Sequence, residues 1–309
     1  MTNVLLLIMS TLFLINPASG KKRNAPEIES LIRKVYGAAN HPYQITYIDF
    51  STLDDTLAQA IDQRVENIFA VGGDGTVNAI GTRLLNTSVN FGVIPSGSGN
   101  GYARNIGFSI RTKLAISQSL NAQVKKVDTG VFGGIPFLNV AGVGLDAEVA
   151  WNFSNGHRRG FAKYAQSSAE SILSYQPENY TLTIDGNVQR FENIIGVAIA
   201  NGTQWGYDAK VAPHARISDG YLDLLVVHKF PLIKVGFIVG MLFGGSLEQS
   251  KYVEVFRAKK IHIHRERDGM AQVDGEPFPS NREIDVEIKA NSLNLLLPGT
   301  LTPEKVDAL

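Results

Sequence analysis

Short apolar runs alternate with amphipathic stretches through the first part of the chain. Residues 68–71 form a continuous apolar run, which is typical of a strand buried on both faces. Residues 25–37 instead repeat apolar side chains at helical spacing, which predicts a helix. Equivalent patterns predict further strands at 11–15, 43–50 and 91–94 and further helices at 53–65 and 77–85. This order predicts βαβ units and a parallel sheet, with ligands at the carboxyl ends of its strands.

After about residue 127 the pattern changes to alternating apolar and polar positions separated by turn residues. It predicts strands at 137–151, 180–185, 194–200, 221–227, 260–264 and 284–288. A mostly antiparallel β-sandwich accounts for such a series. Two helical stretches interrupt it, at 161–175 and 231–245. We interpret the strongly apolar second one as a helix packed on the sandwich; the alternatives are the lip of an apolar pocket and a membrane contact.

The two patterns predict two domains. An α/β domain spans residues 1–127 and the sandwich spans residues 128–291. A last predicted strand at 292–297 fits either domain, so packing of residues 292–309 back on the first domain stays open. The chain has 309 residues, of which 44% are hydrophobic, and this is enough for two separate cores.

Charge and cysteine content exclude several classes of function. Lys plus Arg and Asp plus Glu balance at 29 each. A general nucleic-acid binder needs a basic excess, so nucleic acid is not an expected partner. Cysteine is absent, which excludes disulfides and thiolate metal sites.

The N-terminus carries an apolar run at residues 4–15. It is shorter than the roughly 20 residues that span a bilayer, so the sequence predicts no transmembrane helix. No lysine or arginine precedes the run, which argues against a signal peptide. We interpret the run as a first buried strand at 11–15 with extra apolar residues in front. A signal-peptide core and a membrane-facing tail are the alternatives.

A glycine turn joins the predicted strand at 68–71 to the following helix. Gly72, Gly73 and Gly75 leave backbone N–H groups and the positive end of the helix dipole free for a phosphate. The turn is not a Walker A loop, because no Gly-Lys-Ser/Thr follows. Asp74 would repel a phosphate unless Mg²⁺ lies between them or the carboxylate has a catalytic task. The alternative is a tight turn in which Asp74 and Thr76 cap the helix.

A second glycine turn, Ser-Gly-Ser-Gly-Asn at residues 96–100, also follows a predicted strand and opens a predicted helix. Two such turns at the ends of successive strands of one sheet would lie side by side. This pairing favours a nucleotide site over two unrelated turns.

Six motifs in this order resemble the diacylglycerol kinase catalytic family, which includes sphingosine kinases and bacterial lipid kinases. They are NPxSGK at 16–21, GGDGTVN at 72–78, PxGSGN at 95–100, NxxGxGxDA at 139–147, DGxLD at 219–223 and DGE at 274–276. They cover nearly the whole chain. NAD kinases and phosphofructokinases look similar at GGDGT alone, and the other motifs separate this chain from them.

The resemblance implies an NAD kinase- or phosphofructokinase-like α/β nucleotide-binding domain, a β-sandwich that takes the lipid, and an active site in the cleft between them. It also implies ATP and Mg²⁺ as cofactors. The positions it assigns to nucleotide binding are Asn16, Thr46, Gly72, Gly73, Asp74, Gly75, Thr76, Val77, Asn78, Gly97, Ser98 and Asn100.

Three carboxylates match the family's reaction centre. By position, Glu276 would be the general base on the lipid hydroxyl, and Asp74 and Asp274 would manage Mg²⁺ or the attacking hydroxyl. This agrees with phosphoryl transfer, which needs positioning, Mg²⁺ and a carboxylate at the hydroxyl. The alternative for residues 274–276 is a hairpin turn.

The resemblance also implies a structural Mg²⁺ site. Asp219 would provide its side chain, and Arg216 and Tyr221 their backbone carbonyls. The alternative for Asp219 and Gly220 is again a turn.

The chain departs from the family pattern after the second glycine turn. Bacterial members carry Asn-Asp-Phe-Ala-Arg there, whereas this chain has Asn-Gly-Tyr-Ala-Arg, so Gly101 replaces a carboxylate. The Ser-Gly-Ser-Gly-Asn core is closer to the sphingosine and ceramide kinase branch, which leaves the lipid undetermined. Lys21, Lys22 and Arg23 fit either a solvated run or a contact with an anionic phosphate or membrane.

The sequence as a whole predicts an ATP- and Mg²⁺-dependent lipid kinase. The expected acceptor is the hydroxyl of diacylglycerol, a sphingoid base or a related lipid. The alternatives are an NAD kinase-like kinase of a soluble metabolite and a non-catalytic protein that binds nucleotide or lipid. We expect a cytoplasmic protein with transient, peripheral membrane contact, and homodimer formation stays open.

Overall fold

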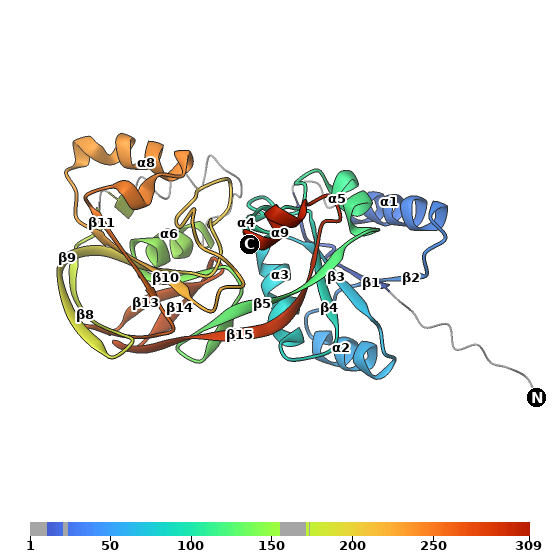
Figure 1. Ribbon diagram of the computed structural model, residues 1–309, viewed down its shortest axis with the longest axis horizontal. Helices are drawn as coiled ribbons and strands as arrows, with labels where there is room; N and C mark the ends of the chain where they lie inside the picture. The colour runs from blue at the N-terminus through green and yellow to red at the C-terminus, as the bar shows by residue number, and fades with distance from the viewer. Residues whose placement is uncertain (1–10, 21–23, 155–170, 173) are drawn as a thin grey trace, which may run out of the picture.

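The computed structural model describes residues 11–20, 24–154, 171–172 and 174–309. Two parts lie side by side along the long axis of the molecule, an α/β part and a curled β-sheet part (Figure 1). None of the helices within the described ranges is long and apolar enough to cross a membrane. The predicted helix at 161–175 lies almost entirely outside the described residues, as do Lys21, Lys22 and Arg23.

The first part is built on a parallel sheet, as predicted. Its strand order is β4-β3-β1-β2, with β1 at Thr11–Ile15, β2 at Tyr43–Tyr47, β3 at Asn67–Gly72 and β4 at Asn90–Pro95. Helices α1 (Ala25–Ala38) and α5 (Thr112–Ser119) lie on one side of the sheet, and α2 (Leu53–Asp62) lies on the other (Figure 1). Helices α3 (Asp74–Gly81) and α4 (Gly101–Asn105) follow β3 and β4.

The core of this part confirms why its strands read as continuous apolar runs. β1 and β3 are buried on both faces, and the rings of Phe13 and Phe69 stack at 5.3 Å between centroids. Two helices end earlier than predicted. The helix predicted at 53–65 ends at Asp62, because Arg64 adopts a left-handed φ of 57°. The helix predicted at 77–85 changes from α3 to a 3₁₀ turn at Thr82–Leu84.

The second part is an antiparallel, sandwich-like sheet. Its strands pair in the order β14-β13-β7-β9-β8-β12-β15, where β15 is Glu283–Leu297, and β10 pairs with both β9 and β11. Their bounds are β6 Ile135–Phe137, β7 Val140–Gly144, β8 Glu178–Ile184, β9 Asn187–Ala200, β10 Leu222–His228, β11 Val253–Ala258, β12 Lys260–Arg265, β13 Gly269–Val273 and β14 Glu276–Ser280. Apolar side chains from these strands form a separate core.

One prediction in this part is wrong. The strand predicted at 137–151 ends at Gly144, and residues 145–151 lie in helix α6 (Leu145–Ser154). Gly144 takes a φ of 95°, and a Cβ there would lie 2.7 Å from the Ile195 carbonyl oxygen. Because only glycine tolerates that turn, the chain leaves the sheet at this point and starts a helix. The apolar stretch at 231–245 is helical as predicted, with a 3₁₀ turn at Leu232–Lys234 and α8 at Val235–Gly244.

Two long strands connect the parts. β5 (Gln123–Phe132) and β15 (Glu283–Leu297) pair antiparallel along most of their length, with a bulge between Lys289 and Leu293. The first half of β15 pairs with β12 in the sandwich, and its second half pairs with β4 in the parallel sheet. Buried Asp128 fixes this crossing, because its carboxylate accepts hydrogen bonds from the Asn291 and Gly220 N–H groups at 2.8 and 2.7 Å. The chain ends in the short helix α9 (Pro303–Asp307).

Candidate active site

A polar cavity of about 740 Å³ lies where the two glycine turns of the first part face the β13–β14 turn of the second. Ten of the predicted site residues line it: Asn16, Gly73, Asp74, Gly75, Thr76, Asn78, Gly97, Ser98, Asp274 and Glu276. The lining omits seven of the predicted site residues: Thr46, Gly72, Val77, Asn100, Arg216, Asp219 and Tyr221. The volume is in the range of small-molecule sites.

The two glycine turns touch each other. A Cβ on Gly97 would lie 2.4 Å from the Gly73 Cα, and one on Gly72 would lie 2.4 Å from the Thr76 Cβ. The Ser96 N–H donates to the Gly72 carbonyl oxygen at 2.9 Å. The turns can approach this closely only because side chains are missing, and their backbones consequently share one wall of the cavity.

Helix α3 begins without a side-chain cap, so the capping alternative for Asp74 and Thr76 is wrong. The N-cap is Gly73, and it makes no side-chain hydrogen bond. Thr76 is buried, and its hydroxyl accepts a hydrogen bond from the Asn16 side-chain amide at 2.7 Å. The Asp74 carboxylate points the other way and accepts the Tyr102 N–H, at the start of α4, at 3.2 Å. The free N–H groups at the start of α3 remain available to an anion.

Asp74 is partly exposed on the cavity wall but is otherwise surrounded by protein. Desolvation raises the pKa of its carboxyl to about 6, the negative charge of Asp274 adds to the rise, and the hydrogen bond from Tyr102 opposes it. Two carboxylates facing one cavity repel each other, and a cation beside Asp74 would relieve that repulsion.

Asp274 occupies the tight turn between β13 and β14. Asp274 and Gly275 have φ values of 48° and 87°, and Val273 pairs with Glu276, so this is the two-residue hairpin considered from the sequence. The Asp274 carboxylate accepts N–H bonds from Leu138 and Asn139 at 2.8 Å.

Two further donors complete the shell of the Asp274 carboxylate: the Val140 N–H at 3.1 Å and the Asn78 side-chain amide at 2.8 Å. Burial raises the pKa of this carboxyl, and the hydrogen bonds oppose the rise. With both oxygens engaged by N–H groups, Asp274 ties the hairpin to α3 and to the start of β7.

Glu276 is exposed at the mouth of the cavity, directly above the first glycine turn. A Cβ on Gly75 would lie 2.7 Å from its Oε1 atom. A carboxylate of the sandwich part therefore reaches the first glycine turn of the α/β part.

Asp146 is a site residue that the sequence reasoning did not assign, although it belongs to the fourth motif. It lies in the first turn of α6, lines the polar cavity, and accepts a hydrogen bond from the Gln272 side-chain amide at 3.1 Å. Desolvation raises the pKa of its carboxyl to about 7. Gly142 makes room for it, since a Cβ there would lie 2.4 Å from Asp146 Oδ2. In the sequence, the glycines of that motif were the signal that could have identified Asp146 as a site residue.

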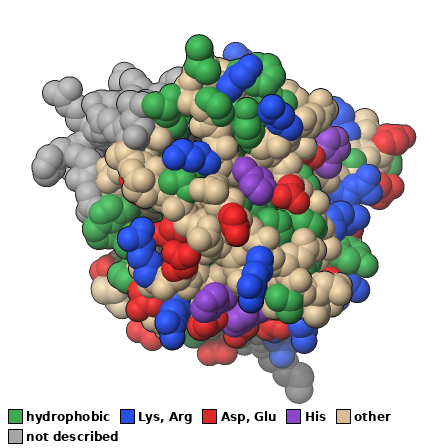
Figure 2. All heavy atoms as spheres, turned by 90° about the vertical axis from the view of Figure 1, so that its left-hand side faces the viewer, with side chains coloured by type: hydrophobic (Ala, Val, Ile, Leu, Met, Phe, Trp, Pro, Cys, Tyr) green, Lys and Arg blue, Asp and Glu red, His purple; other side chains and the backbone are tan. Residues whose placement is uncertain are grey.

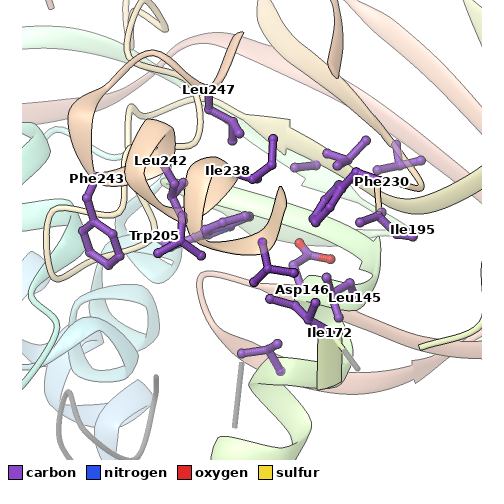
Figure 3. Close-up of a pocket in the computed structure, with 17 residues that line it drawn as sticks. Leu145, Asp146, Ile172, Ile195, Trp205, Phe230, Ile238, Leu242, Phe243 and Leu247 are labelled. Carbon is purple, nitrogen blue, oxygen red and sulfur yellow. The ribbon is translucent and has the colours of Figure 1, made fainter. Parts of the chain in front are cut away.

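A second cavity of about 290 Å³ adjoins the first and is almost entirely apolar. Helix α8 and strand β9 provide much of its wall, and Asp146, Val149 and Trp205 line both cavities. Figure 3 shows the Asp146 carboxylate among apolar side chains, including Leu145, Ile172, Ile195, Phe230, Ile238, Leu242 and Leu247. An elongated apolar ligand with a polar end would place that end at Asp146.

The segment 205–208 explains why Gly101 replaces a carboxylate. A Cβ on Gly101 would lie 2.5 Å from the Trp205 carbonyl oxygen, so no side chain fits. The Tyr207 N–H donates to the Gly99 carbonyl oxygen at 3.3 Å. Arg104 donates to the same carbonyl at 3.2 Å and pairs with Asp208 at 2.6 Å. Asp208 thus provides a carboxylate beside this helix from a different segment.

The residues predicted to hold a structural Mg²⁺ lie apart from the polar cavity. The Asp219 carboxylate accepts the Tyr221 N–H at 3.1 Å and pairs with the Arg257 guanidinium. The Gly220 N–H donates to Asp128 at the crossing of the two parts. Within the described residues, no cluster of three or more His, Asp or Glu side chains is arranged to hold a metal. A structural Mg²⁺ at Asp219 stays a prediction.

The donors of the polar cavity fit a Mg²⁺ that arrives with a nucleotide. Protein sites for Mg²⁺ commonly use one or two carboxylates and complete the shell with phosphate and water oxygens. Asp74 faces the cavity, and the neighbouring charge of Asp274 favours a cation there.

Comparisons with known proteins agree with this architecture. The model of the diacylglycerol kinase catalytic domain matches residues 10–132, and that of the YegS C-terminal NAD kinase beta sandwich-like domain matches residues 139–297. A diacylglycerol kinase of Staphylococcus aureus is 28% identical over 286 residues, covering 88% of this chain and 90% of its own. A diacylglycerol kinase of Staphylococcus saprophyticus is 25% identical over 268 residues, covering 84% of this chain and 87% of its own.

A solved structure shows the same fold. The crystal structure of a diacylglycerol kinase from Bacillus anthracis superposes with a TM-score of 0.72 at 20% identity, over 96% of this chain and 98% of that one. The two domain matches together extend from the first strand to the last, and they correspond to the α/β part and the sandwich part. The chain belongs to the diacylglycerol kinase catalytic family and is a kinase.

Proposed function

We propose that this protein transfers the γ-phosphoryl group of ATP, with Mg²⁺, to the hydroxyl of a lipid. One observation carries the proposal: a polar cavity beside two glycine turns adjoins an apolar cavity, and Asp146 lies on the wall of both. A polyanion fits the first cavity and a hydrocarbon chain fits the second, so the reacting groups would meet between them.

The polar cavity supports the nucleotide assignment. The N–H groups at the start of α3 and in the second glycine turn would bind the phosphates, with Asn16 and Ser98 beside them. Mg²⁺, held by Asp74, would neutralise the charge on the transferred phosphoryl group. Phe50 is half exposed, lines the polar cavity and offers an aromatic surface to the adenine ring of the nucleotide.

The position of Glu276 supports its assignment as the general base. Its carboxylate is exposed and reaches the first glycine turn, so it can accept the proton of an acceptor hydroxyl as the oxygen attacks the γ-phosphorus. Asp146 would orient that hydroxyl from the other side. Asp274 would hold the hairpin that carries Glu276, through its four hydrogen bonds.

The character of the second cavity favours a lipid over a soluble metabolite. An NAD kinase-like acceptor site would present polar groups, whereas the residues around this cavity are apolar apart from Asp146. We also propose a cytoplasmic enzyme, since ATP and Mg²⁺ are available there, with transient contact at the membrane that holds its acceptor.

Transfer of labelled phosphate tests the proposal. The wild-type protein is incubated with [γ-³²P]ATP, Mg²⁺ and either NAD or one of diacylglycerol, sphingosine, ceramide and phosphatidylglycerol in mixed micelles. We expect label in at least one lipid and its loss when the metal is chelated. Label in NAD without lipid would support the soluble-metabolite alternative, and ATP binding without any transfer would support a non-catalytic protein.

A further inference from the structure

Helix α8 and the turn before it present apolar side chains to the outside of the molecule. Ile233 is 90% exposed, Phe237 is 62% exposed and Leu232 is 59% exposed. We call Leu232, Ile233 and Phe237 the α8 surface. Large apolar side chains gathered at one place on a surface commonly mark an interaction site.

The opposite side of the same helix lines the apolar cavity. Ile238, Leu242 and Phe243 belong to the cavity wall, whereas Ile233 and Phe237 do not. From Leu232 to Gly244 the only charged residue is Lys234. A helix at a water-exposed surface is expected to be polar on its outer side. This helix is apolar on both sides, as expected for an element that separates a lipid-binding cavity from a second apolar environment.

The charges around the α8 surface are mainly basic. Lys229, Lys234 and Lys251 are exposed, and Glu248 is the one acidic residue between Lys229 and Lys251. The Glu248 carboxylate is bonded to His214 at 2.6 Å. In Figure 2, green apolar and blue basic side chains lie together at the top of the view, the end at which Figure 1 shows α8.

Aromatic contacts connect Lys234 to the α8 surface and Lys251 to a residue next to the wall of the apolar cavity. The Lys234 ammonium lies 5.8 Å from the centre of the Phe237 ring, and the Lys251 ammonium lies 5.2 Å from that of Tyr252. Tyr252 in turn packs against Phe230, a residue of the cavity wall, with ring centres 5.9 Å apart. Exposed apolar side chains accompanied by exposed lysines match the interface of a bilayer with anionic head groups.

We propose that the α8 surface docks on an anionic lipid bilayer. The inference rests on the proposed lipid kinase function and adds the place of contact. Leu232, Ile233 and Phe237 enter the head-group layer, and Lys229, Lys234 and Lys251 contact its phosphates. The apolar cavity then lies directly behind the helix that contacts the bilayer, so an acceptor lipid has a short path from the membrane into it.

Vesicle sedimentation tests the docking. The wild-type protein, the double variant Ile233→Ser/Phe237→Ser and the control Val188→Ser are each mixed with vesicles of phosphatidylcholine containing phosphatidylglycerol. Val188 is 66% exposed, as much as Phe237, but lies on β9 away from α8. We expect the double variant to bind about tenfold more weakly and the control to bind as the wild type does. Equal binding of all three proteins would overturn the proposal.

The role of charge is measured with Lys229→Gln/Lys234→Gln/Lys251→Gln. We expect each lysine to account for up to about fivefold of the affinity for anionic vesicles. We expect little change on pure phosphatidylcholine. An unchanged affinity for anionic vesicles would overturn the electrostatic part. If analytical ultracentrifugation instead shows a wild-type dimer that Ile233→Ser/Phe237→Ser dissociates, the surface is a self-association interface and the proposal is wrong.

Kinase activity separates this inference from the proposed function. With a short-chain diacylglycerol that is soluble as a monomer, the double variant is expected to keep the wild-type rate, since Ile233 and Phe237 do not line either cavity. Vesicle binding by a wild-type protein that phosphorylates no lipid would disprove the function and leave the surface standing. If the wild type phosphorylates a lipid but binds vesicles no better than the double variant, the docking surface is disproved and the proposed function stands.

Discussion

Three carboxyl groups of the site have raised pKa values because they are enclosed by protein. Burial is the largest cause for Asp74, Asp146 and Asp274. The neighbours that oppose this rise are N–H groups, from Tyr102 for Asp74 and from Gln272 for Asp146. Such groups place unfavourable charge inside the protein, which is typical of a functional site and costs folding stability.

Asp146 gives a prediction about stability and pH. Its pKa is raised from 3.8 to about 7, so the folded state binds this proton more tightly than the unfolded state does. The bound proton therefore stabilises the fold. This stabilisation is complete below about pH 4 and is lost as the pH rises through about 7. Asp146→Asn keeps an acceptor for Gln272 and removes the charge. We expect the variant to be more stable than the wild type at pH 8, by on the order of 4 kcal/mol at most, and to match it near pH 4.

The measurement is thermal or urea unfolding of the wild type, Asp146→Asn and the control Asp62→Asn across that pH range. Asp62 is exposed at the end of α2, so its replacement is expected to shift stability little at any pH. A stability gap between Asp146→Asn and the wild type that does not grow with pH would show that Asp146 is not protonated by burial.

At the scale of elements, the proposed nucleotide site depends on the contact between the two glycine turns. Gly97→Ala would place a methyl group 2.4 Å from the Gly73 Cα and 2.9 Å from the Asn100 side-chain oxygen. The turns would have to separate, which moves N–H groups away from the phosphates. We expect the affinity for MgATP, measured by calorimetry, to fall about tenfold or more.

Gly37→Ala is the matched control, since Gly37 lies in α1 with no heavy atom within 4 Å of its would-be Cβ. It is expected to bind MgATP like the wild type. An unaltered MgATP affinity in Gly97→Ala would mean that the second turn does not take part in nucleotide binding.

The parallel sheet and its glycine turns could be predicted because their determinants are local. A buried strand, a glycine turn and a helix face each leave a pattern within about 20 residues. The end of β7 at Gly144 could not be predicted, because alternating residues of β7 continue into α6 and only the packing of Gly144 against β9 stops the strand. Strand β5 was not predicted at all, since its partner β15 lies at the other end of the chain.

Prediction of the site is limited in the same way, by contacts between segments that are distant in the sequence. The resemblance to lipid kinases identified Glu276, Asp274 and Asp74 as candidate residues. The hydrogen bonds that hold the carboxylates of the site in place join segments far apart in the sequence. Asn78 bonds Asp274 across 196 positions, and Gln272 bonds Asp146 across 126. Neither bond leaves a local pattern, so the anchoring of Asp274 and the position of Asp146 on both cavities emerged only from the structure.

At the scale of the whole molecule, the two parts are arranged so that each provides half of the site. The paired strands β5 and β15 run through both, and the β13–β14 hairpin of the sandwich brings Glu276 to the glycine turn of the α/β part. The apolar cavity lies wholly in the second part, behind Asp146. The arrangement predicts that nucleotide binding and phosphoryl transfer are separable by mutation, since the glycine turns proposed to bind phosphate and the proposed general base, Glu276, belong to different parts.

Glu276→Gln tests that account most directly. In the presence of MgATP and an accepted lipid, we expect the rate of phosphoryl transfer to fall by about 10²- to 10⁴-fold, because the amide cannot accept the proton of the hydroxyl. The affinity for MgATP is expected to stay unchanged, and Glu192→Gln, an exposed glutamate of β9, to behave like the wild type. Transfer by Glu276→Gln at the wild-type rate would contradict the account.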